Sequence, residues 1–157
     1  MSTPTAPSPL APLARRVHAA APLDAPGKQI GKTVRSKLGP GAVKDLLSGT
    51  WLGHPLHPVL TDVVIGSWTS ATLLDLLGGR GTEKGAQRLI AIGIAAFPPT
   101  ALTGVTDWAD TEIADDGVRR VGLVHALTNS VALGLYSSSL RARRRGDHGR
   151  GVALALA

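Results

Sequence analysis

Three long apolar stretches dominate the hydrophobic pattern of this chain, at residues 59–77, 89–105 and 121–140. The second and third contain no Asp, Glu, Lys or Arg, and the first contains only Asp62 and Asp75. At a rise of ~1.5 Å per residue, helices of ~17–20 residues just cross a ~30 Å hydrocarbon core. The pattern therefore predicts an all-α transmembrane bundle with three spans. A soluble helical bundle is the alternative, because the stretches are only modestly hydrophobic.

The segments around these stretches set the predicted domain organisation. Gly78 and Gly79 end the first stretch, and a short apolar run from residue 151 predicts the start of a fourth helix that is cut short. We expect residues 44–157 to form one multi-helix membrane domain. Residues 1–43 are basic and rich in Pro and Ala, so we expect them to be disordered. The alternative for residues 27–47 is a short amphipathic helix lying on the membrane.

Helix interiors add support for a membrane location. Pro98 and Pro99 lie near the centre of the second stretch. Such a pair breaks a helix in water, whereas in lipid the neighbouring helices satisfy the freed carbonyls. Small residues also recur at every fourth position of the third stretch, a pattern that favours close helix approach. They are Gly122, Ala126, Ser130, Gly134 and Ser138.

Composition and charge narrow the function classes. The 157-residue chain has no cysteine, which excludes disulfides, Cys-ligated zinc and Cys-ligated iron–sulfur clusters. Its net charge of +6 comes from basic residues that flank apolar stretches without interleaved aromatics, so we expect no nucleic-acid partner. The Arg-rich run at residues 141–145 and the basic loop at residues 80–88 lie on one side. The positive-inside rule places them in the cytoplasm of a multi-pass cell-membrane protein.

The sequence Gly-His-Pro-Leu-His-Pro at residues 53–58 carries the candidate chemistry. Connectivity puts the start of the first span, the end of the second and the start of the third at the same membrane face, which we expect to be the outer one. That face collects His54, His57, Asp62, Asp107 and His125. Ionisable groups at membrane depth are usually functional. The alternatives are a helix-capping role for His57 and simple solvation for the two aspartates.

Two function classes fit these residues. In the first, His54, His57 and His125 hold haem b, or together with Asp107 and Asp62 they hold a transition metal, and the protein supports electron transfer. In the second, the protein is a non-catalytic membrane scaffold, or the same residues form a proton or ion relay. A zinc hydrolase is less favoured, because the zincin signature with its internal Glu is absent.

These residues also carry a family resemblance. The sequence LLSGTWLGHPLHPVLTDVVIGSWTSATLLDLLGG at residues 46–79 resembles bacterial membrane proteins with domain of unknown function 2231. The motifs TGVTDWAD at residues 103–110 and VGLVHALTNSVALGLY at residues 121–136 extend the resemblance over roughly residues 44 to 145. It implies a membrane domain of usually four spans, with family histidines at His54, His57 and His125 and a family acid at Asp107.

The resemblance also bears on partners. Some relatives are fused to a Rieske-type iron–sulfur domain, which implies electron transfer with such a protein as partner. This chain cannot hold a Rieske cluster itself, because two of its ligands would be cysteines. Relatives carry a complete fourth helix with a further histidine, whereas the apolar run from residue 151 is too short to cross a bilayer. A homo-oligomer is compatible with this pattern, since a second chain would complete the bundle.

Overall fold

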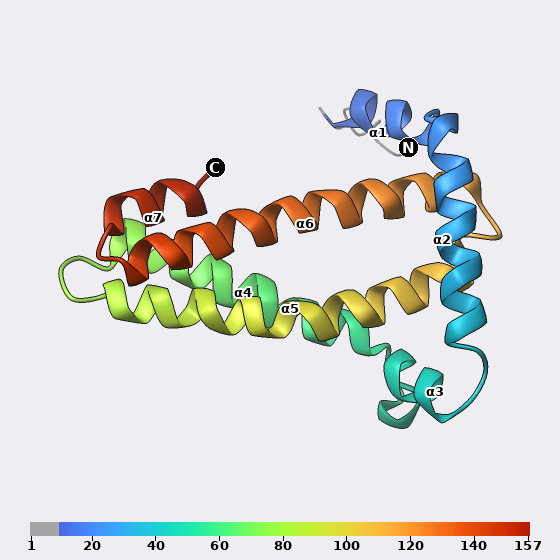
Figure 1. The fold of residues 1–157 in the computed structure, drawn as a ribbon, viewed down its shortest axis with the longest axis horizontal. Helices are drawn as coiled ribbons and strands as arrows, with labels where there is room; N and C mark the ends of the chain where they lie inside the picture. Colours follow the sequence, from blue (N-terminus) through green and yellow to red (C-terminus); the bar gives the residue numbers. More distant parts are fainter. Residues whose placement is uncertain (1–9) are drawn as a thin grey trace, which may run out of the picture.

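A computed structural model describes residues 10–157, and within them every regular element is helical. The elements are α1 (Ala11–His18), η1 (Ala21–Leu23), α2 (Asp24–Lys37), α3 (Ala42–Ser48), η2 (Thr50–Leu52), α4 (Leu56–Leu77), α5 (Glu83–Thr111), α6 (Asp116–Arg144) and α7 (His148–Ala155). Helices α4, α5 and α6 run along the length of the molecule (Figure 1). Helix α2 crosses one end, and α7 folds back along α6 at the other. The predicted all-α class is confirmed.

Helices α4 and α5 form an antiparallel hairpin with the most extensive packing in the molecule. Trp68 of α4 packs against Gly93 of α5, where an added Cβ would lie 2.2 Å from the indole nitrogen. The same indole stacks on Tyr136 of α6, with ring centroids 4.0 Å apart. A glycine is therefore required at this crossing, because any side chain there would displace the largest aromatic residue of the core.

The helix α5 runs without a break through Pro98 and Pro99. Both prolines lie on its exposed side, and the following Thr100 donates its hydroxyl proton to the carbonyl of Ala96 at 2.8 Å. The helix also extends beyond the apolar stretch of residues 89–105 at both ends. This extension lies outside the apolar pattern because residues 83–88 and 106–111 include charged residues, which helices accept equally well.

Two helices, α4 and α5, are long and apolar enough to cross a membrane. Most of their residues are not buried inside the protein, so their apolar side chains are available to lipid. Helix α6 contains the whole predicted span of residues 121–140, but it is not among these two helices. Its His, Asn, Ser and Thr residues lower its hydrophobicity. A third span therefore stays a prediction, and so does the fourth, since α7 has only 8 residues.

The N-terminal region differs from the expected disorder. Residues 11–18 and 24–37 are helical, and α2 packs against α5 and α6. We expected disorder because of the Pro and Ala content, but composition does not reveal the tertiary contacts that stabilise these helices. Pro12 and Pro26 both lie in a first helical turn, where a missing N–H costs nothing. Residues 1–9 lie outside the described part, and the domain boundary at residue 43 stays a prediction.

A buried carboxylate joins α2 to the loop between α5 and α6. Glu112 is 0% exposed. It accepts hydrogen bonds from Arg35 of α2 and from Arg119 of α6, each at 2.6 Å. Gly31 faces this carboxylate so closely that a Cβ would lie 2.3 Å from its Oε1 atom. Burial alone would raise the pKa of Glu112, but the hydrogen bonds and charges of the two arginines hold it below its ordinary value.

A second ion pair fixes the start of α2. Arg120 of α6 binds both carboxylate oxygens of Asp24, at 2.8 and 2.7 Å. Its other terminal nitrogen donates to the carbonyl of His18 at the end of α1. The hydrogen bond from Arg120 holds the pKa of Asp24 below its ordinary value. Arginines at the start of α6 thus hold both N-terminal helices.

The opposite end of the bundle has its own buried ion pair. Arg143 of α6 and Asp75 of α4 form a two-point contact, with Nη1 to Oδ1 at 2.9 Å, and their side chains are only 1% and 2% exposed. Ser139 accepts a hydrogen bond from Arg143 at 3.1 Å and donates to the carbonyl of Gly151 in α7. This cluster therefore ties α4, α6 and α7 together.

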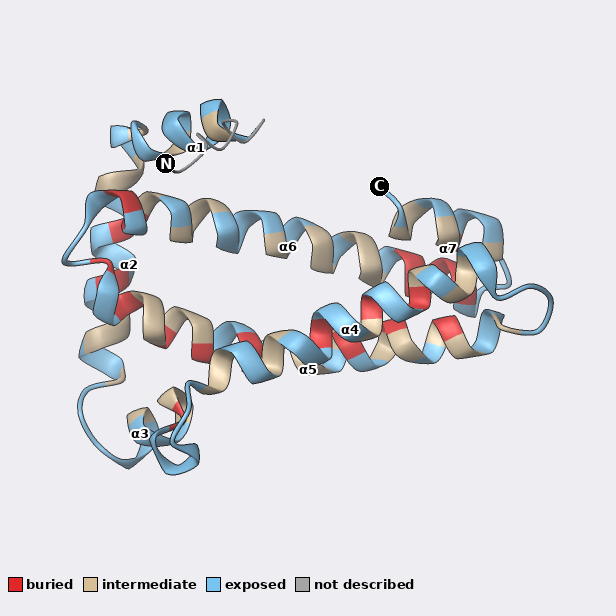
Figure 2. Cartoon of the chain, turned by 180° about the vertical axis from the view of Figure 1, so that it is seen from behind, coloured by how far each residue is buried: buried red, intermediate tan, exposed pale blue. Residues whose placement is uncertain are grey.

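The buried residues of α6 lie near its two ends (Figure 2). None of its residues between Arg119 and Ser139 is buried. The predicted strip of small residues makes a close approach at Gly122, which meets Trp108 of α5, whereas Gly134 has no neighbouring atom within 4 Å of a Cβ position. Close packing in this protein depends instead on single glycines that each face one large side chain.

Candidate functional site

His57 is the predicted site residue that the fold holds most firmly. It lies in the first turn of α4, half-buried, and its Nδ1 atom is 2.9 Å from the backbone carbonyl of Thr100 in α5. A carbonyl oxygen can only accept, so we infer that Nδ1 carries the proton and that Nε2 has the lone pair. Among the described residues, Nε2 makes no hydrogen bond. This nitrogen is therefore free to bind a proton or another ligand.

The surface of α5 is shaped to receive this imidazole. A Cβ at Gly104 would lie 2.6 Å from the Cε1 atom of His57, so the ring lies directly on the α5 backbone. The hydroxyl of Thr103, which is 1% exposed, donates to the Thr100 carbonyl at 2.9 Å. The threonine and glycine in the Thr103-Gly104 pair thus serve different purposes: one is a hydrogen-bond donor and the other leaves space for the ring.

Asp107 follows one turn after Gly104 on α5 and is half-buried. It interacts electrostatically with His57, Asp110 and Lys44. Lys44 of α3 forms an ion pair with Asp110 at 2.7 Å. Asp107 therefore lies within electrostatic range of His57 without forming an ion pair with it in the described part of the chain, and a lysine from the preceding short helix lies in the same neighbourhood.

The other predicted ligands lie elsewhere. His54 is exposed in the turn before α4, and its Nδ1 atom lies 2.9 Å from the carbonyl of the next residue, Pro55. Asp62 is exposed on α4. His125 is exposed on α6, and its Nε2 lies 2.8 Å from the side-chain amide nitrogen of Asn129, one turn further along the helix. The start of α4 and the first half of α6 lie on opposite sides of α5 (Figures 1 and 2).

This placement bears on the expected haem or metal. Within residues 10–157, no group of three or more His, Asp or Glu side chains is placed to hold a metal ion. Haem ligation by His125 with His57 or His54 would need these histidines to face one another, which the arrangement around α5 does not provide. The cofactor hypothesis therefore stays a prediction without geometric support in this fold.

Trp108 lies next to the candidate site, and its contact with α6 was not predicted from the sequence. It follows Asp107, and its indole ring faces Gly122 of α6, where a Cβ would lie 2.2 Å from Nε1. That Nε1 atom is buried and has no hydrogen-bond partner in the described part of the chain. An unpaired buried donor is uncommon in native structures. The TDWAD motif at residues 106–110 could have drawn attention to it, since Trp108 adjoins the predicted acid.

Helices α4 and α5 leave apolar side chains available to lipid, and His57 lies at one end of the hairpin that they form. These features are those of a helical membrane protein. The family described as predicted membrane protein (DUF2231) matches residues 53–157, and the chain belongs to this family. The match confirms the family predicted from the His-Pro motif. No curated protein matches the chain, and no solved structure does. The orientation across the membrane and the Rieske-type partner stay predictions.

Proposed function

We propose that this membrane protein exchanges protons at His57, and that Asp107 stabilises the protonated form. The observation that carries the proposal is the hydrogen bond from Nδ1 to the Thr100 carbonyl at 2.9 Å. It fixes the ring in one orientation and leaves Nε2 as the basic nitrogen. In the exchange, Nε2 takes a proton from a hydronium ion, which leaves as water, and the ring becomes an imidazolium with an N–H on both nitrogens. When the proton leaves, the Nε2–H bond breaks and a water molecule accepts the proton.

The surroundings of His57 fit a role in proton exchange better than a purely structural role. The imidazolium keeps the Thr100 carbonyl as an acceptor, and the nearby Asp107 carboxylate offsets its charge. Both residues lie at one end of the α4–α5 hairpin, where a span meets water. A histidine that served only as a helix cap would not need Gly104 to leave space for its ring, and it would not need an acid nearby. A proton relay therefore accounts for more of this site than a scaffold role does.

Proton flux into vesicles tests this function. We expect purified protein in liposomes with an entrapped pH dye to carry a flux that His57→Gln lowers at least about tenfold, because a positioned proton-transfer group usually contributes more than that. Gly104→Ala should also lower the flux, since its Cβ would displace the His57 ring although the side chains of His57 and Asp107 are both retained. Asp107→Asn should lower it through loss of the stabilising charge.

His54→Gln is the matched control. It removes the same type of side chain three residues earlier, from an exposed position where the ring contacts the carbonyl of the adjacent Pro55. Its flux should equal that of the unmodified protein. Equal flux for His57→Gln and His54→Gln would refute the relay, as would unmodified protein that is no more permeable than empty liposomes. A Soret band or bound metal that disappears in His57→Gln would favour the electron-transfer function instead.

A further inference from the structure

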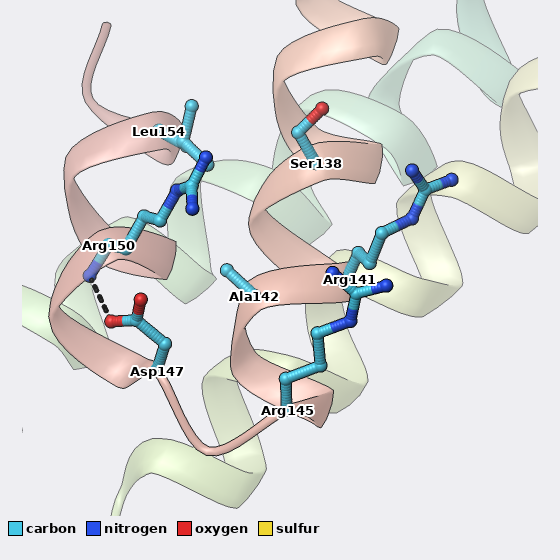
Figure 3. A pocket seen from close by; sticks show the side chains of 7 residues that line it. All are labelled: Ser138, Arg141, Ala142, Arg145, Asp147, Arg150 and Leu154. Atoms are coloured by element: carbon cyan, nitrogen blue, oxygen red, sulfur yellow. Dashed lines mark hydrogen bonds between the residues drawn. The ribbon is translucent and has the colours of Figure 1, made fainter.

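A pocket of about 300 Å³ lies between α6 and α7, at the far end of the bundle from His57. Arg141 and Arg145 of α6 and Arg150 of α7 contribute to its lining (Figure 3). Ser138, Ala142, Asp147 and Leu154 complete the lining. We propose that this pocket binds the phosphate group of an anionic phospholipid.

The three arginines are available to a ligand. All three are exposed, and in the described part of the chain their side chains form no ion pair and no hydrogen bond. The buried Arg143 beside them is different, because Asp75 neutralises it. Asp147 is the one acid in the lining, and it accepts a hydrogen bond from the backbone N–H of Arg150 at 3.1 Å as the cap of α7. Three guanidinium groups against one carboxylate leave an excess of positive charge.

The depth of the pocket points to a lipid rather than to a solute. Arg143 lies between Arg141 and Arg145 in the sequence and binds Asp75, in the last turn of the candidate span α4. The 22 residues of α4 form a helix about 33 Å long, which matches the hydrocarbon thickness. The pocket therefore lies at the level where lipid headgroups begin. Basic pockets between helices at this level bind anionic headgroups.

The lining also suits both parts of a phospholipid. Guanidinium groups bind phosphate oxygens through paired, charge-assisted hydrogen bonds. Leu154 and Ala142 provide apolar contacts for the first carbons of an acyl chain. Because more than one positive charge is uncompensated, a lipid with two phosphodiesters, cardiolipin, should bind more tightly than phosphatidylglycerol with one. The proposal is independent of proton exchange, since it uses other residues at the other end of α5.

Native mass spectrometry of the delipidated full-length protein in detergent tests the proposal. Cardiolipin, phosphatidylglycerol, phosphatidylcholine and inorganic phosphate are titrated separately. We expect cardiolipin to bind in preference to phosphatidylcholine, and the double variant Arg141→Gln with Arg150→Gln to weaken its binding about 25-fold. Each arginine near an anionic lipid surface contributes a factor of about five. Neither side chain has a structural contact, so the variant should unfold at the same temperature as the unmodified protein.

The double variant Arg144→Gln with Arg80→Gln is the charge-matched control. Both arginines are exposed and basic but do not line the pocket. It should bind cardiolipin as the unmodified protein does. An equal loss of binding in the two double variants would overturn the pocket, since general surface charge would then explain the binding. Tight binding of inorganic phosphate without binding of either anionic lipid would overturn the assignment to a lipid.

Discussion

Replacing Asp75 by Ala is expected to lower the free energy of unfolding by about 3–5 kcal/mol, the usual cost of leaving one partner of a buried ion pair uncompensated. The Arg143 side chain would stay 1% exposed with its charge unpaired. Ser139 would remain its hydrogen-bond acceptor, but a hydroxyl does not neutralise a guanidinium. Because this cluster joins α4, α6 and α7, the loss should appear in global unfolding, measured by denaturant titration in detergent micelles.

Two further variants separate the ion pair from other effects. Asp62→Ala removes an exposed aspartate from the same helix and should change stability by less than about 0.5 kcal/mol. The double variant Asp75→Leu with Arg143→Met should recover much of the loss, since an apolar pair of similar volume replaces a buried ion pair well. A loss for Asp75→Ala no larger than that for Asp62→Ala would contradict the buried pair.

Replacing Glu112 by Gln is expected to release α2 from the bundle, at a cost of about 2 kcal/mol. This cost is smaller than that for Asp75, because the side chain of Arg35 is 31% exposed and water can partly replace its lost partner. Arg119, whose side chain is only 4% exposed, would keep Asp116 and Asp24 nearby. Hydrogen exchange of the α2 amides measures the effect directly, because opening of α2 exposes them.

The same contact gives the docking of α2 a defined dependence on pH. The pKa values of Glu112 and Asp24 are both lower in the folded protein than their ordinary values. Their contribution to stability is therefore fully present above the ordinary carboxyl pKa of about 4, and it is lost as the pH falls through the folded-state pKa. After correction for the slower intrinsic exchange of amides in acid, the protection of the α2 amides should fall as the pH is lowered, and Glu112→Gln should reduce this fall.

Asp110→Asn is the control for Glu112→Gln. Asp110 also pairs with a basic residue of a preceding helix, Lys44, but its side chain is 42% exposed. Exposed ion pairs contribute about 0–1 kcal/mol, so this variant should leave the exchange of α2 nearly unchanged. Exchange rates of α2 that are the same in Glu112→Gln and in the unmodified protein would show that the carboxylate does not hold this helix.

The long helices could be predicted from the sequence because their signal is local. Apolar runs and the Gly78-Gly79 stop locate α4 within a few residues, and the connectivity correctly brings the start of α4 to the end of α5. The N-terminal helices could not be predicted this way. Their order depends on contacts between Arg35 and Glu112 and between Asp24 and Arg120, which are 77 and 96 residues apart in the chain.

The candidate site could be predicted only in part for the same reason. His57 and Asp107 could be found because each adjoins a span end, where an ionisable group is conspicuous. The acceptor for His57 is a backbone carbonyl, which any residue provides and no side-chain pattern reveals. Whether His125 faces His57 depends on the position of α6 around α5, and no hydrophobic period specifies that position.

Nitrogen NMR of ¹⁵N-histidine-labelled protein in lipid nanodiscs tests the central claim most directly, with His57→Gln used to assign the signal. In alkaline buffer, where the imidazole is neutral, we predict that His57 carries its proton on Nδ1 and its lone pair on Nε2, because Nδ1 donates to Thr100. Acidification should then protonate Nε2. A neutral His57 with its proton on Nε2 would contradict proton exchange at this site. So would a His57 that gains no second proton at any pH above the one at which the protein unfolds in acid.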